Sequence, residues 1–286
     1  MKNSILIIVL LIIIDFQAYS QGSISKVDTI IYKKIDTTSL IMKVIYPPSM
    51  DKSKQYPGMV FFFGGGWKGG SINHFELQAK YFAGRGIICF LVDYRVESRH
   101  GTNVYECIMD AKSAIRYVRE NADSFHVDGN KIIGSGGSSG GHLAASTAMV
   151  EGYNDQNDNT SISSTPNALV LFNPVLDLLL SSSYAKVREK YKQISPLHNI
   201  KEGLPPTIIF HGTEDTAVPV ESIQYFQVAS IRLGNRCELF LYEGQEHGFF
   251  NFSRNEENYK KTVYDTDKFL ISLGYLNGEP TIMNEK

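Results

Sequence analysis

A serine set among glycines is the first candidate for chemistry in this chain. Gly136, Ser138 and Gly140 fit the pattern G-x-S-x-G, between a short apolar segment and a run of small residues. In this pattern the serine occupies a strained turn between a strand and a helix, and the small neighbours leave room for the turn. The following helix points its positive end at the serine, which favours a developing oxyanion. The pattern therefore predicts a nucleophile at Ser138.

A second register of the same pattern would make Ser139 the nucleophile, between Gly137 and Gly141. We favour Ser138 because this register leaves Gly140 and Gly141 free for close packing of the helix. It also places the Ser139 N–H directly after the nucleophile, where an oxyanion hole needs a donor. A run rich in glycine and serine can also be a plain loop, but the flanking strand and helix patterns argue against that.

A serine nucleophile at neutral pH needs a base and a group that orients the base. His247 follows the last predicted strand, and Asp215 follows the strand before it. Both residues therefore fall on loops at the same edge of the sheet as Ser138. The chain order Ser, Asp, His is the one expected for this arrangement. We predict Ser138, Asp215 and His247 as a catalytic triad.

Other residues of the same types are alternatives to the predicted acid and base. Glu214 is adjacent to Asp215, and Asp177 follows the preceding strand, so either carboxylate could be the acid. Three further histidines are more typical of structural residues than of a base: His142, His198 and His211.

A run of three glycines, residues 64–66, directly follows another buried strand. The N–H groups of such a loop are unobstructed by side chains. We predict that the Gly65, Gly66 and Ser139 N–H groups form an oxyanion hole, with the Trp67 N–H as an alternative donor. The loss of one such donor typically costs about 10²–10³ in rate.

Aromatic rings near these loops are candidates for contact with a substrate. Trp67, Tyr94 and Phe249 could each offer a flat face to a substrate, although each could equally belong to the core. Arg95, which follows Tyr94, is expected instead to form a structural ion pair with Asp110 in the next helix.

The elements that must position these residues alternate between strands and helices. This order predicts an α/β fold of parallel βαβ units with right-handed crossovers, after an initial antiparallel pair. We expect about eight strands, flanked by helices, with ligands bound at the carboxyl ends of the strands. The predicted strands are residues 29–32, 40–46, 58–63, 87–93, 131–134, 168–173, 207–211 and 238–242. The predicted helices are residues 75–83, 104–121 and 258–273, with two more beginning near Ser139 and at Pro219.

Two segments between these elements are longer than a simple connection. Residues 151–166 are polar and rich in asparagine, which predicts a solvated loop. Residues 177–195 are predicted to form either a minimal cap near the site or a surface helix.

The charge and the cysteine content of the chain give no support for binding to nucleic acid, a membrane surface or zinc. The net charge is −2 with an isoelectric point near 6.4, which gives no electrostatic case for binding nucleic acid or a membrane surface. The three cysteines allow at most one intramolecular bridge and have no zinc-site spacing. Cys89 and Cys107 fit buried thiols better than metal ligands. We therefore expect no metal site at the cysteines, and acyl transfer by a serine, histidine and aspartate needs neither a metal nor a cofactor.

The first 20 residues have the pattern of a secretory signal peptide. Lys2 supplies the positive charge, and residues 5–14 form an apolar run shorter than the roughly 20 residues that span a bilayer. An A-x-S site predicts cleavage after Ser20. Residues 21–286 would then form one secreted or periplasmic domain that is not inserted in the membrane. An uncleaved anchor is the alternative, and a homodimer is allowed for.

These motifs together resemble the α/β-hydrolase superfamily. The segment FFFGGGW is similar to the HGGGW oxyanion loop of the esterase/lipase branch. DYR, GGSSGGHLAA, HGTEDTAVP and EHGFF are similar to acetyl xylan and feruloyl esterases and to related dienelactone-hydrolase-like and peptidase-like enzymes. The resemblance covers nearly all of residues 46–276 and implies Ser138 as nucleophile, Asp215 as acid and His247 as base. One departure is Phe63, which stands where the family usually has a histidine that braces the glycine loop.

The function expected from this resemblance is that of an exported serine esterase. Its substrates would be acetyl or feruloyl esters of polysaccharides, or small-molecule esters, cleaved through an acyl-enzyme. An exopeptidase of the prolyl-oligopeptidase type is an alternative, although the chain has no propeller and no evident acidic motif for a free amino terminus. A non-catalytic binding module is another, but such modules usually lose a triad member.

Overall fold

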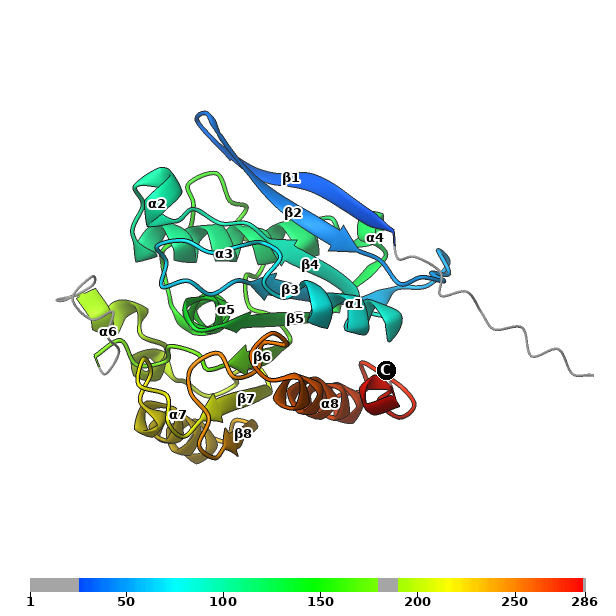
Figure 1. The fold of residues 1–286 in the computed structure, drawn as a ribbon. Coiled ribbons are helices and arrows are strands. Elements are labelled where there is room, and N and C mark those ends of the chain that lie inside the picture. The colour runs from blue at the N-terminus through cyan, green and yellow to red at the C-terminus, as the bar shows by residue number, and fades with distance from the viewer. Residues whose placement is uncertain (1–25, 180–189, 285–286) are drawn as a thin grey trace, which may run out of the picture.

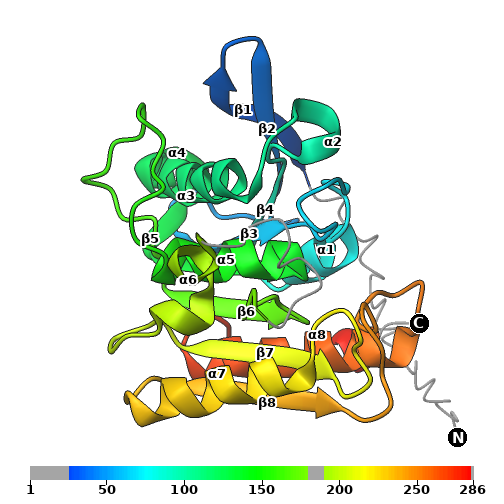
Figure 2. The same cartoon turned by 90° about the vertical axis from the view of Figure 1, so that its left-hand side faces the viewer.

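A mixed sheet runs through the computed structural model, which describes residues 26–179 and 190–284. Over these residues eight strands form one sheet in the order β1-β2-β4-β3-β5-β6-β7-β8, which runs from top to bottom in Figure 2. β2 pairs antiparallel with β1 and β4, and all other neighbours are parallel. The strands are β1 (Val27–Ile35), β2 (Thr38–Ile45), β3 (Tyr56–Phe62), β4 (Ile88–Val92), β5 (Val127–Gly137), β6 (Ala168–Phe172), β7 (Thr207–Gly212) and β8 (Cys237–Tyr242). The predicted α/β architecture is confirmed.

Helices cover both faces of this sheet (Figure 1). Side chains of α3, α5 and α7 share one apolar core with the sheet, and side chains of α1 and α8 share the other. The α-helices are α1 (Glu76–Gly84), α2 (Glu97–His100), α3 (Val104–Glu120), α4 (Ala122–Phe125), α5 (Ser139–Met149), α6 (Tyr191–Ile194), α7 (Val220–Arg232) and α8 (Glu256–Ser272). Short 3₁₀ turns occupy Pro196–Asn199 and Ile282–Asn284.

The central strands are buried on both faces. In β3, Val60 and Phe62 enter one core, and Met59 and Phe61 enter the other. A strand covered on both sides is a continuous apolar run, as the sequence shows here. Each large apolar side chain buried in this way stabilises the fold by about 1.5–3 kcal/mol. The sheet is therefore a rigid support for the loops at its carboxyl edge.

Strand β5 is longer than the predicted strand at residues 131–134. It begins at Val127, which is buried and pairs with Tyr56 of β3. At its other end it continues through glycines to Gly137, which pairs with Phe172 of β6. Glycine has a low strand propensity, so the strand predicted from the apolar run ends before the glycines. Backbone partners on both sides hold the glycines extended and bring the strand directly to Ser138.

Several further expectations can be compared with this fold. The polar segment 151–166 contains turns and no helix or strand, as predicted. Cys89 and Cys107 are buried thiols, also as predicted. The one-turn helices α2 and α4 were not predicted, because four residues are too few to show helical periodicity. The predicted signal peptide and residues 180–189 of the predicted cap lie outside the described residues. No helix in the described part of the chain combines the length and apolarity needed to cross a bilayer.

Candidate active site

Ser138 occupies the turn between β5 and α5 with a backbone conformation that few residues adopt. Its φ is 55° and its ψ is −122°, a conformation that costs on the order of 1–3 kcal/mol. A Cβ atom on Gly136 would lie 2.4 Å from the Gly140 carbonyl oxygen, and one on Gly140 would lie 2.1 Å from the Phe62 oxygen. Both glycines are therefore required where G-x-S-x-G places them. The alternative register is wrong, because Ser139 is fully buried in the first turn of α5.

The structure brings together the three side chains predicted as a triad. His247 lies on the loop after β8, and its Nε2 is 2.9 Å from Ser138 Oγ. Its Nδ1 is 2.7 Å from Oδ2 of Asp215, on the loop after β7. Asp215 is 5% exposed and can only accept, so the imidazole donates through Nδ1. Nε2 is then the acceptor for the Ser138 hydroxyl proton, as a general base requires.

Asp215 is held as a carboxylate by several donors. Its Oδ1 accepts the N–H groups of Ala217, at 3.0 Å, and Val218, at 2.9 Å. Burial by itself would raise the pKa of this carboxyl, but the hydrogen bond and charge of His247 and the Val218 N–H lower it below its ordinary value. The group is therefore ionised at neutral pH and can stabilise a protonated His247.

The alternative acids lie elsewhere. Glu214 is exposed, and its backbone N–H donates to the Gln245 oxygen on the loop after β8. Asp177 accepts from the Leu179 N–H and lies 4.0 Å from His198. The geometry therefore favours Asp215 among the three carboxylates.

Two of the other candidate histidines, His142 and His211, are buried in the protein interior, whereas His198 is exposed. His142 donates to the Ile194 oxygen at 2.8 Å, and burial lowers its pKa to about 4. His211 donates to the Val218 oxygen at 2.9 Å, and burial lowers its pKa as well. Both are structural residues, as the sequence indicated.

An open pocket of about 330 Å³ adjoins the triad. Residues 64–66, Ser138 and His247 line it. Side chains that the sequence analysis did not select also line it: His74, Asn173, Phe250, Asn251 and Arg254. A carbonyl group placed in this pocket would meet the serine hydroxyl and the glycine loop together.

The glycine loop has the backbone conformation that frees its N–H groups. Gly65 has a φ of +142°, and a Cβ atom there would lie 2.2 Å from the Gly69 oxygen, so only glycine fits. Among the described residues, the Gly65 N–H has no hydrogen-bond acceptor. The Ser139 N–H lies in the first turn of α5, where N–H groups have no intrahelical partner. Both can donate to a ligand, and the oxyanion-hole assignment to Gly65, Gly66 and Ser139 stays a prediction.

For the three aromatic residues the structure favours the core alternative over contact with a substrate. Trp67, Tyr94 and Phe249 are 1%, 0% and 3% exposed, so other side chains cover their faces. The Tyr94 hydroxyl donates to the Phe63 oxygen at 2.7 Å, and its ring stacks on the Phe63 ring at 4.1 Å. Their positions in the sequence placed these rings near the carboxyl edge of the sheet. The sequence could not show that the rings point into the apolar cores between the sheet and the helices.

Three contacts in the site were missed. The Gly64 N–H donates to His74 Nδ1 at 3.0 Å, and the Gly248 N–H donates to Asn173 Oδ1 at 2.9 Å. Arg254 donates to the His247 oxygen at 3.1 Å. For the first of these contacts the available signal was Phe63, because its apolar ring put the support of the glycine loop in doubt; the sequence held no signal for the other two.

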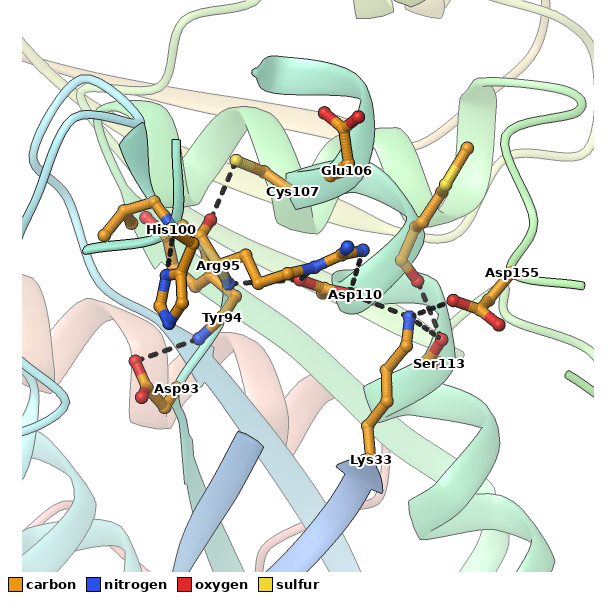
Figure 3. Close-up of polar contacts among 12 residues, drawn as sticks. Lys33, Asp93, Tyr94, Arg95, His100, Glu106, Cys107, Asp110, Ser113 and Asp155 are labelled. Carbon is orange, nitrogen blue, oxygen red and sulfur yellow. Dashed lines mark hydrogen bonds and ion pairs between the residues drawn. The ribbon is translucent and has the colours of Figure 1, made fainter. Parts of the chain in front are cut away.

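The predicted ion pair between Arg95 and Asp110 is confirmed, and it belongs to a larger group (Figure 3). Asp110 accepts from Lys33 at 2.7 Å, and Lys33 lies 2.9 Å from Asp155. We call Lys33, Arg95, Asp110, Ser113 and Asp155 the α3 charge cluster.

Comparisons with known proteins show a family and solved structures to which this chain is similar. The BD-FAE family model matches residues 44–178 and 171–229. Esterase 2 of Thermogutta terrifontis, solved after phosphorylation by paraoxon, superposes with a TM-score of 0.84 at 45% identity, over 91% of this chain and 98% of that one. The same esterase has been solved with propionate bound, with a TM-score of 0.84 and 44% identity over the same shares of both chains.

Curated relatives are more distant. Esterase LipC of Mycobacterium tuberculosis is 28% identical over 69% of this chain and 54% of its own length. The acetylxylan esterase of Xylanibacter ruminicola is 31% identical over 65% of this chain and 39% of its own. The chain thus spans about half the length of the curated relatives it matches.

Proposed function

The chain belongs to the BD-FAE family of α/β-hydrolase esterases, and we propose that it hydrolyses carboxylic esters with Ser138, His247 and Asp215 as its catalytic triad. The observation that carries this proposal is the continuous hydrogen-bonded path from the serine hydroxyl through the imidazole to a buried carboxylate. That path opens into a pocket lined by the glycine loop.

The acylation step follows from the positions of these groups. Ser138 Oγ attacks the ester carbonyl carbon while its proton passes to His247 Nε2. Asp215 holds the imidazole through Nδ1–H and stabilises its positive charge. The Gly65, Gly66 and Ser139 N–H groups donate to the oxyanion of the tetrahedral intermediate. His247 then gives the proton to the departing alkoxide, and the ester C–O bond breaks.

Deacylation uses the same groups in reverse. Water enters the pocket and loses a proton to His247 Nε2 as its oxygen attacks the acyl carbon. The second tetrahedral intermediate collapses to the free acid, and Ser138 recovers its hydroxyl proton from His247.

Short acyl groups, acetyl in particular, are the proposed substrates, with a sugar hydroxyl as the leaving group. An acetylxylan esterase is among the relatives, and the Thermogutta esterase has been solved with propionate and with butyrate bound. Feruloyl esters are the second group to test. The measurement is the acid released from acetylated and feruloylated polysaccharides, identified by mass.

Export is part of the proposal. The leader at residues 1–20, with its A-x-S site, supports cleavage after Ser20. Expression in a bacterial host with its leader should give a periplasmic or secreted protein whose N-terminus is Gln21. A product that retains Met1 in the membrane fraction would show an uncleaved anchor instead.

Ser138→Ala tests the proposed chemistry. The variant should lose about 10⁴-fold or more in kcat for p-nitrophenyl acetate, because the nucleophile is gone, and should remain folded by circular dichroism. It should also fail to react with a fluorophosphonate probe that labels the wild type.

Ser135→Ala is the matched control for this test. Ser135 is buried in β5, the strand that leads to Ser138, and its hydroxyl has no partner among the described residues, so turnover should be unchanged. Full ester turnover in Ser138→Ala would contradict the assignment. Cleavage of aminoacyl-naphthylamides without ester cleavage would point to an exopeptidase, and a wild type that no probe labels would point to a binding module.

A further inference from the structure

The support of the glycine loop comes from a residue outside the predicted motifs. The Gly64 N–H donates to Nδ1 of His74, 3.0 Å away. Because a backbone N–H can only donate, Nδ1 must be the unprotonated nitrogen of this ring. The ring proton is then on Nε2, which lies 2.8 Å from Asn251 Oδ1 and donates to it.

The orientation of the Asn251 amide is fixed independently of His74. Its Nδ2 donates to the Gly248 oxygen at 2.8 Å, which leaves Oδ1 to face the imidazole. Gly248 directly follows His247, and its own N–H is held by Asn173 at 2.9 Å. One hydrogen-bonded path therefore runs from Gly64 through His74 and Asn251 to the loop of the base.

This path joins two walls of the same pocket that lie far apart in the sequence. Gly64 packs directly on the nucleophile turn, because a Cβ atom there would lie 3.0 Å from the Gly137 oxygen and 3.4 Å from Ser138 Cβ. Gly64, His74, Gly248 and Asn251 all line the pocket. A small shift of Gly64 would thus move the glycine-loop N–H groups relative to Ser138.

The glycine loop needs such a brace because it carries no side chains of its own. A Cβ atom on Gly66 would meet no other atom within 4 Å, so a side chain at that position would find no neighbour to pack against. Phe63, at the position where related proteins usually have the bracing histidine, is buried against Tyr94. Its apolar ring can accept no hydrogen bond from the loop.

We propose that His74, as the neutral Nε2–H tautomer, is a positioning residue that holds the oxyanion loop in register with Ser138 and couples it to the His247 loop. The inference rests on the proposed esterase function. His74 acts through Gly64 and Asn251 and takes no part in bond making or breaking.

The neutral state is required for this role. A doubly protonated ring would present Nδ1–H to the Gly64 N–H, so that two donors would oppose each other. Burial lowers the pKa of His74, and the hydrogen bond to Asn251 offsets this only in part. The ring is therefore neutral at neutral pH.

A pair of variants tests the proposal. His74→Leu removes both hydrogen bonds and should lower kcat for p-nitrophenyl acetate by about 10- to 100-fold, which is part of the effect of losing an oxyanion donor. KM should change by less than about threefold, because the loop binds the transition state more strongly than the ester ground state. Phosphorylation of Ser138 by paraoxon should slow in parallel, because the phosphoryl oxygen of paraoxon needs the same oxyanion-hole N–H donors as the ester.

His74→Gln should restore most of the activity. Its side-chain carbonyl can accept from the Gly64 N–H, and its amide can donate to Asn251 Oδ1. A structural role without positioning would not predict this recovery of kcat at constant KM.

His100→Leu is the matched control. It removes the same kind of bond, since the Val96 N–H donates to His100 Nδ1 at 3.1 Å, but it lies outside the pocket. Its kcat should stay within about twofold of the wild type.

The outcomes separate this proposal from the proposed function. An active wild type with an unchanged kcat in folded His74→Leu would overturn the positioning role, as would a loss confined to KM. Activity in His74→Gln as low as in His74→Leu would also overturn it. Ester turnover that survives Ser138→Ala would instead overturn the esterase assignment itself.

Discussion

Two groups of polar side chains in this protein, each with a fully buried carboxylate, look alike at first and behave differently. The triad and the α3 charge cluster each join residues from distant segments, and each lies beside a cavity. In the α3 charge cluster, Asp110 accepts from Lys33, from the Arg95 N–H and twice from the Arg95 guanidinium, all at 2.7–3.0 Å (Figure 3). Both of its oxygens are occupied, and no part of it is exposed.

The triad differs because one end of it is open. Ser138 and His247 line the pocket, while only the inner carboxylate of Asp215 is fully enclosed. The nucleophile also sits on a strained backbone, whereas Asp110 lies in regular helix α3. A cavity and clustered charges therefore do not identify a reactive site. A reactive site is identified by a group that faces the cavity and still has unused hydrogen-bonding capacity.

Replacing the carboxylate with an amide should affect a different property in each group, activity in the triad and stability in the α3 charge cluster. Asp215→Asn should lower kcat by about 10⁴-fold, because an amide in place of the carboxylate no longer favours the tautomer in which Nε2 accepts from Ser138. The measurement is kcat for p-nitrophenyl acetate, with folding checked by circular dichroism. A loss below about tenfold would mean that another carboxylate orients His247.

Asp110→Asn should act on stability and leave chemistry intact. The amide cannot neutralise Arg95 and Lys33, so two buried cations lose a counter-charge, and removal of one partner of a buried ion pair costs about 3–5 kcal/mol. Denaturation in urea should show this loss, and kcat per folded molecule should stay within about threefold. A stable variant with lost activity would contradict the division between the two groups.

A smaller effect, on folding stability, should come from the titration of His142, which lies near the active site but has no catalytic role. The folded state holds His142 with a pKa of about 4, below its ordinary value, so the unfolded chain binds its proton first as pH falls. Stability should therefore decline from about pH 6.5 downward, by on the order of 2–3 kcal/mol at pH 4.

His142→Gln, which keeps a donor for the Ile194 oxygen, is the comparison for this effect. Its unfolding free energy, measured by urea denaturation from pH 7 to pH 4, should fall less steeply than that of the wild type. Equal slopes for the two proteins would show that His142 is not the group responsible.

The sequence alone was enough to predict the parts of the site that depend on local pattern. G-x-S-x-G specified the turn at Ser138, because a side chain on Gly136 or Gly140 would collide with nearby backbone atoms. These atoms belong to Gly140 itself or to Phe62 on the neighbouring strand β3. The positions of Asp215 and His247 followed from a simple rule, since parallel strands end at one edge of a sheet and their loops meet there.

Other features depended on how distant side chains pack, and only the tertiary structure decided them. Trp67 and Tyr94 lie at the correct edge, yet their rings turn into the core, because direction at the end of a strand is set by the layers that cover it. The exclusion of Glu214 required the direction of each side chain, which adjacent positions do not reveal.

The brace at His74 shows this limit most clearly. Its partner Asn251 is 177 residues away in the chain, and no spacing rule connects the two. The sequence determined which residues could react, because that chemistry is carried by local turns and strand ends. The tertiary structure determined what holds them in place, because a hydrogen bond between loops exists only after the sheet has brought those loops together.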